Sequence, residues 1–131
     1  MGSGARTRLS PGPASVTEVV TADDVRAVGL GLPRAYERMI RGRWKLKVGQ
    51  IVFAAFSRDE TDLGFGYPKA ERDGLVASDP ATFFLPPPAD LRYQWVCAHL
   101  DRLDPEEMRE LVVEAWRMVV AKRVAAAYQG P

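Results

Sequence analysis

The chain has 131 residues, a formal net charge of +1 and 47% hydrophobic residues, a composition typical of one globular domain that buries its own core. Its single cysteine, Cys97, excludes an internal disulfide bond and a cysteine-rich metal site, and it favours a reducing compartment. No apolar run approaches the roughly 18 residues of a membrane-spanning helix, and the N-terminus lacks the apolar core of a secretory signal. We therefore expect a cytoplasmic protein without membrane contact.

Residues 1–20 begin with glycine, serine, alanine and proline, and they contain little apolar surface to bury before Val16. This composition predicts a disordered tail at residues 1–20, followed by a single domain at residues 21–128. Thr21, followed by Asp23 and Asp24, predicts the start of a short helix that ends before the next proline.

The segment 34–47 carries six basic residues against one acidic residue, Glu37. In its second half, apolar side chains alternate with Lys45 and Lys47, and this period of two predicts a strand with both lysines on one face. A hairpin turn at Gly49 and Gln50 follows. The segment therefore predicts a basic strand at the start of an antiparallel meander.

Further strands and a short helix follow in order. The pattern predicts strands at 51–56 and 62–67, a short helix at 68–77, a strand around 82–85 and a last strand at 92–100. In the last strand, Trp95, Cys97 and His99 are expected on the face opposite the helices.

Residues 104–124 carry the clearest helical pattern. Asp104 is placed to cap the helix, Pro105 suits its first turn, and Glu107 has the capping-box spacing. A helix of this length would be about 30 Å long, enough to lie across a small sheet. The predicted fold is α+β, with two layers, a roughly five-stranded antiparallel sheet, helices on one face and the order α-βββ-α-ββ-α.

Several segments together resemble the MmcQ/YjbR family of small proteins over about residues 21–126. The most specific features are the Asp79, Pro80, Phe83, Phe84 cluster, Trp95 at the head of the last strand, and the Leu103 to Glu106 entry into the last helix. The resemblance implies a two-layer fold similar to type III secretion chaperones and frataxin, and a function in DNA binding. Gly66 stands where many members have a lysine, and Tyr93 and Gln94 stand where many have a lysine and a glycine.

The basic strand is the best functional candidate. Arg41, Arg43, Lys45 and Lys47 are placed to contact phosphates, and Trp95 could stack a base across the open sheet face. The same residues are also consistent with an ordinary solvated face, since no helix-turn-helix, zinc finger or RNP motif is present.

Other candidate sites are weaker. Cys97 and His99 are two residues apart on one strand, which does not by itself give a catalytic dyad. The acidic residues between Asp101 and Glu114 are explained by helix capping and a solvated face, although a cation site is the alternative. We predict no catalytic residues, no metal site and no cofactor.

The sequence thus predicts a non-enzymatic binding protein with DNA or RNA as partner and low sequence specificity. The alternative is a protein-interaction or chaperone-like module that uses the open sheet face or the sheet edge.

Overall fold

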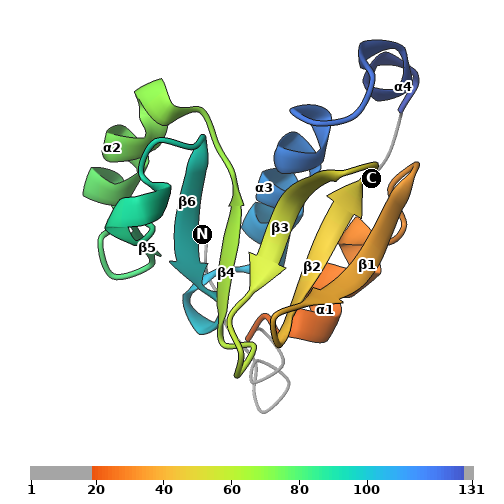
Figure 1. Cartoon of the computed structure of the whole chain (residues 1–131). Coiled ribbons are helices and arrows are strands. Elements are labelled where there is room, and N and C mark those ends of the chain that lie inside the picture. The colour runs from red at the N-terminus through yellow and green to blue at the C-terminus, as the bar shows by residue number, and fades with distance from the viewer. Residues whose placement is uncertain (1–18, 129–131) are drawn as a thin grey trace.

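The computed structural model describes residues 19–128 (Figure 1). Its helices and strands are α1 (Ala22–Gly29), β1 (Ala35–Ile40), β2 (Arg43–Val48), β3 (Ile51–Phe56), β4 (Asp62–Gly66), α2 (Lys69–Ser78), β5 (Phe83–Phe84), β6 (Trp95–His99), α3 (Pro105–Arg117) and α4 (Lys122–Ala127). Residues 1–18 of the expected tail lie outside the described residues, whereas Val20 is buried in the core.

The strands form one six-stranded sheet in the order β1-β2-β3-β4-β6-β5, and every neighbouring pair is antiparallel. Helices α1 and α3 pack against each other and lie behind the sheet, while the opposite face of the central strands is left open (Figure 1). This confirms the predicted α+β fold with a largely sequential antiparallel sheet. The sheet has six strands where about five were expected.

The additional strand is β1, which the sequence interpretation treated as a lead-in to the basic strand. Arg41 and Gly42 have φ values of 54° and 81°, and Ile40 pairs with Arg43 across them. Positive φ at both central residues defines a two-residue hairpin turn of the kind that matches the twist of antiparallel strands. The sequence did not predict this turn, because its first central residue is Arg41, whereas asparagine or aspartate is the usual residue there.

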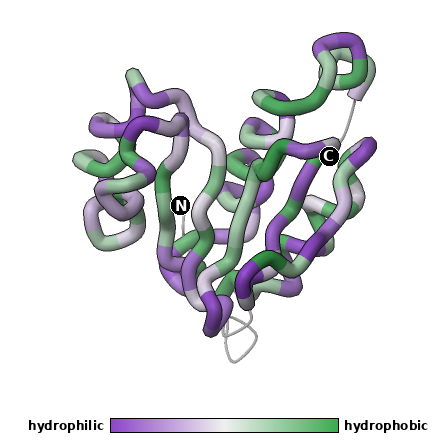
Figure 2. The backbone as a smooth tube through the Cα atoms, in the orientation of Figure 1, coloured by the Kyte–Doolittle hydropathy of each residue, from purple (hydrophilic) through white to green (hydrophobic). Residues whose placement is uncertain are grey.

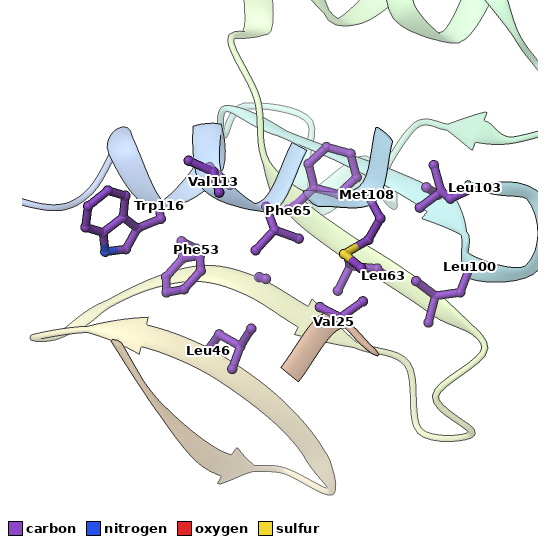
Figure 3. Packing of buried hydrophobic residues seen from close by; sticks show 14 of the residues in the cluster. Val25, Leu46, Phe53, Leu63, Phe65, Leu100, Leu103, Met108, Val113 and Trp116 are labelled. Carbon is purple, nitrogen blue, oxygen red and sulfur yellow. The ribbon is translucent and has the colours of Figure 1, made fainter. Parts of the chain in front are cut away.

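The core lies between the sheet and the two helices α1 and α3. Leu46 and Phe53 from the strands and Val113 and Trp116 from α3 point into the same space (Figure 3), and Trp116 is completely buried. The indole Nε1 of Trp116 donates a hydrogen bond of 2.8 Å to the carbonyl oxygen of Pro33, so its polar atom is satisfied inside the core.

The predicted helix 104–124 is wrong in its extent. Asp104 does cap its start, with Oδ1 accepting from the backbone N–H of Glu107 at 2.8 Å, but α3 ends at Arg117. The chain then turns and forms α4, since Arg117 donates to the carbonyl oxygen of Ala125 and the ring of Tyr128 packs against Trp116 at 5.1 Å. These tertiary contacts end the helix at Arg117, although the helical spacing of apolar residues continues to residue 124. Within residues 19–128, no helix has the length and apolar character needed to cross a membrane.

Arg26 of α1 collects three carboxylates on the helix side of the sheet. Its guanidinium contacts Glu37 at 2.5 Å, Glu60 at 2.7 Å and Asp23 at 3.1 Å, and it lies 4.6 Å from the ring centre of Phe56. Only 18% of the Arg26 side chain is exposed. The hydrogen bond from Arg26 lowers the pKa of Glu60. Arg26 thus joins α1 to β1 and to the β3–β4 turn.

Replacing Arg26 with alanine should lower the free energy of unfolding by about 2 kcal/mol, because it leaves Glu37 and Glu60 without their cation in a half-buried position. Because the pKa of Glu60 is lowered in the folded state, this stabilisation is present above the ordinary carboxyl pKa and is lost as the pH falls through the lowered value. Urea unfolding of both proteins at pH 7 and pH 3 measures the difference. Asp23→Ala is the control and should cost little, since the Asp23 side chain is 91% exposed. Equal losses for Arg26→Ala at both pH values would contradict this account.

Candidate nucleic-acid interface

The strand register defines which side chains share the open face of the sheet. Leu46 is fully buried in the core, so Arg43, Lys45 and Lys47, at alternating positions, point away from it. Their cross-strand partners on β1 are Ile40, Arg38 and Tyr36, and paired residues of antiparallel strands point to the same face. The predicted placement of both lysines on one face is therefore supported by the register.

Within the described part of the chain, the cations of the β1–β2 hairpin have no acidic partners. Among residues 19–128, no carboxylate lies within 4 Å of the charged groups of Arg38, Arg41, Arg43, Lys45 or Lys47. The acidic residue of β1, Glu37, points to the other face and binds Arg26. In Figure 2, β2 is largely hydrophilic along the backbone and the neighbouring β3 is largely hydrophobic. The hairpin therefore presents unneutralised positive charge.

The exposed fraction differs strongly between these cations. Arg41 and Arg43 are exposed and Lys45 is partly exposed. Lys47 is only 7% exposed, and its Nζ lies 5.9 Å from the ring centre of its cross-strand partner Tyr36. Tyr36 is fixed by its hydroxyl, which donates to the carbonyl oxygen of Gly49. Lys47 is therefore the least accessible of the four predicted phosphate contacts.

A row of small residues connects the basic hairpin to Trp95. Lys45 is paired with Ala55, Ala55 with Gly64, and Gly64 with Cys97. The edge of the Trp95 indole lies over Gly64, because a Cβ at that glycine would come within 2.5 Å of the indole Nε1. Lys45 and Gly64 are two strand spacings apart, roughly 10 Å. One extended ligand can therefore contact both the cations and the indole.

The only carboxylate that the register places on the open face of β4 is bound by a histidine. Asp62 is paired with His99 on β6, and Asp62 Oδ1 lies 2.7 Å from His99 Nδ1. The imidazole stacks on the ring of Phe84 with 4.6 Å between ring centres and 26° between planes. Asp62 is thus engaged at the far side of the face from β1, where it does not neutralise the basic hairpin.

Cys97 lies between the Trp95 and Phe84 contacts and is partly buried. Burial raises the pKa of its thiol to about 11, the nearby Asp62 adds to this increase, and the positive charge of Arg43 acts against it. No hydrogen bond joins Cys97 and His99 within the described part of the chain. The thiol is therefore protonated at neutral pH and is not activated for nucleophilic chemistry.

The acidic residues at the start of α3 line a shallow hollow together with Asp79 and Arg102. Asp104 is used as the helix cap there. Among residues 19–128, no group of three or more histidine, cysteine, aspartate or glutamate side chains is arranged to hold a metal ion.

Sequence reasoning identified most of the basic hairpin, and it placed Trp95 on the correct face. It missed Arg38, which is paired with Lys45, because β1 was not recognised as a strand. It also missed the stacking of His99 on Phe84, which no local signal in the sequence indicates.

The architecture defines a class of small α+β domain, with one antiparallel sheet covered by helices on one face and a basic hairpin at the sheet edge. The YjbR family model matches residues 30–118, which include every strand and α3, and the chain belongs to the YjbR family. This confirms the family resemblance read from the sequence. The match covers all of the predicted interface residues but leaves out α1 and α4.

A solved structure has the same fold. The crystal structure of Deinococcus radiodurans protein DR2400, with family-model domain DUF419, superimposes with a TM-score of 0.70 at 22% sequence identity, covering 81% of this chain and 83% of that chain. At this identity the similarity shows the fold alone. No match was found among curated proteins.

Alkylation of Cys97 tests the description of its surroundings. Since the pKa of the thiol is raised to about 11, iodoacetamide should react about a hundredfold more slowly than with free cysteine at pH 8, and the rate should reach half its plateau near pH 11. The urea-unfolded chain is the control and should react at the ordinary rate. A folded-state rate profile with its midpoint below pH 9 would contradict this assignment.

Proposed function

We propose that the protein binds nucleic acid with low sequence specificity through the open face of its sheet, without catalysing a reaction. The observation that carries this proposal is the absence of acidic partners for the cations of the β1–β2 hairpin among residues 19–128. Unpaired lysine and arginine side chains on one surface are the electrostatic feature that binds phosphate backbones.

The position of Trp95 favours binding of single-stranded nucleic acid over binding of a duplex. No acceptor binds its indole Nε1 in the described part of the chain, and it lies on the same face as the cations. An aromatic side chain beside a basic surface can stack an unpaired base, whereas bases inside a duplex are already stacked. Among residues 19–128, no helix projects from this face to enter a major groove, which favours contacts to the backbone over reading of base edges.

The surroundings of Cys97 and His99 support a binding role without catalysis. The thiol is held protonated, and His99 is used in its contacts with Asp62 and Phe84. We also place this activity in the cytoplasm, in agreement with the free thiol of Cys97.

The decisive variant reverses two accessible charges of the hairpin, Arg43→Glu and Lys45→Glu. Fluorescence anisotropy with a labelled single-stranded oligonucleotide should show binding to the wild type that weakens log-linearly with salt. The double variant should lose at least tenfold in affinity at low salt, and the slope of log K against log salt should fall by about 1.4, because about 0.7 counterion is released per phosphate contact.

Arg102→Glu/Arg109→Glu is the matched control, since both arginines are exposed at or near α3 and the change in net charge is the same. This control should bind as the wild type does. If it weakens binding as much as the hairpin variant, the effect is one of net charge and not of this surface. No binding by the wild type at low salt would overturn the proposal and leave the protein-interaction alternative.

Trp95→Leu tests the stacking contribution separately. The variant keeps all charges, so the slope against salt should remain unchanged while affinity for single strands falls by roughly fivefold to a hundredfold. Affinity for a blunt duplex should change less. An equal loss for single strand and duplex would show that Trp95 supports the fold of the surface and does not stack a base.

A further inference from the structure

Strand β1 leaves one side of the sheet unpaired. It is the first strand in the sheet order, and no other strand within residues 19–128 pairs with its free side. It has six residues and contains neither proline nor a bulge toward β2. The other edge strand, β5, has only two residues. Proteins usually block a long free edge, because its unpaired backbone groups can bind another strand.

The backbone groups that β1 offers follow from its hairpin. Ile40 and Arg43 close a two-residue turn as a hydrogen-bonded pair, so Glu37 and Met39 direct their N–H and C=O groups away from β2. The N–H of Ala35 already donates to the carbonyl oxygen of Leu32. A partner strand can therefore pair fully with Glu37 and Met39, and it can donate to the carbonyl oxygen of Ala35.

A second copy of the chain fits this edge when the pairing is centred on Glu37. In this antiparallel register, Arg38 of each copy lies opposite the exposed ring of Tyr36 in the other, and Ala35 lies opposite Met39. Both aligned pairs are favourable, as a cation beside an aromatic ring and as apolar neighbours. The two Glu37 residues meet at the centre, but each carboxylate is held by Arg26 at 2.5 Å on the helix side.

The neighbouring register, centred on Arg38, is less favourable. It would place Arg38 of one copy directly opposite Arg38 of the other, on a face where each already has Lys45 beside it. Like charges directly opposite each other destabilise a strand pair. Of these two registers, the charge on β1 therefore favours the one centred on Glu37.

We infer that two copies of the chain pair through β1, antiparallel and centred on Glu37, to form one continuous sheet of both protomers. The open faces of the two copies then adjoin, with both basic hairpins at the junction. Their repulsion keeps the copies apart at low salt, whereas screening, or a polyanion that spans both hairpins, allows the strands to pair. The effect of a polyanion on dimerisation rests on the proposed nucleic-acid binding, whereas the pairing of the two β1 strands does not.

Sedimentation equilibrium of the full chain across a salt series tests the pairing without nucleic acid. We expect the dimer fraction to rise with salt, opposite to an interface held by ion pairs. Tyr36→Glu places a carboxylate opposite Arg38 of the partner at two symmetric positions, and it should tighten dimerisation about fivefold. Tyr36→Lys should weaken it at least as much, and Tyr36→Lys/Arg38→Glu should restore it, because the ion pair is then reversed.

Tyr36 is 37% exposed, so these variants should fold, and thermal unfolding checks this. Tyr36→Phe is the control for the hydroxyl that donates to Gly49. A monomer at every salt concentration would overturn the inference, as would equal effects of Tyr36→Glu and Tyr36→Lys. Addition of a single-stranded oligonucleotide should raise the dimer fraction at low salt. If salt alone produces the dimer and the oligonucleotide does not bind, the pairing stands and the proposed nucleic-acid binding fails.

Discussion

The placement of Arg26 determines how charge is distributed across the sheet. Its guanidinium holds Glu37 and Glu60 on the helix side, and it is itself fixed against the ring of Phe56. Without a cation at this position, the Glu37 carboxylate would have no partner on the helix side of the sheet, where only 19% of its side chain is exposed, and the fold would be less stable. Because Glu37 is bound behind the sheet, the charged residues on the open face of the β1–β2 hairpin are all cations, beside the uncharged Tyr36 and Ile40. The contact of Arg26 with Glu37 therefore compensates the one carboxylate of β1 on the helix side, and the positive charge of the open face is left without it.

The hydrogen-bonded pair of Asp62 and His99 lies at the far side of that surface. Asp62 and His99 are bound to each other, and stacking on Phe84 holds the imidazole in place. Between this pair and the basic hairpin lie Ala55 and Gly64, two small residues that leave the open face of the sheet flat. Gly64 is needed here because a side chain would collide with the indole of Trp95. The open face is thus divided into a cationic part, a flat centre and an aromatic part, an order that suits an extended polyanion carrying planar groups.

Local patterns were sufficient to predict the two-layer fold. The alternation of Lys45 and Lys47 with apolar residues, and the caps at Thr21 and Asp104, depend on neighbours within one element and were correctly read. The errors came from contacts between elements. The helix break after Arg117 is set by packing of Tyr128 on Trp116, and the burial of Lys47 is set by Tyr36 on the next strand. Neither contact can be recognised before β1 and α4 are placed.

Arg38 connects the surface to the edge of the sheet. On the open face it extends the basic row beyond Lys45, and on the free edge it is the charge that discourages unselective strand pairing. A charge that only blocked the edge would destabilise pairing with any strand in every register. Here the alternating order of Tyr36, Arg38 and Ile40 makes the opposition depend on register, because Arg38 repels itself but can face Tyr36. In the inferred dimer, the edge is therefore protected against random aggregation but can pair with a second copy, and screening of the surrounding positive charge sets the balance between these two outcomes.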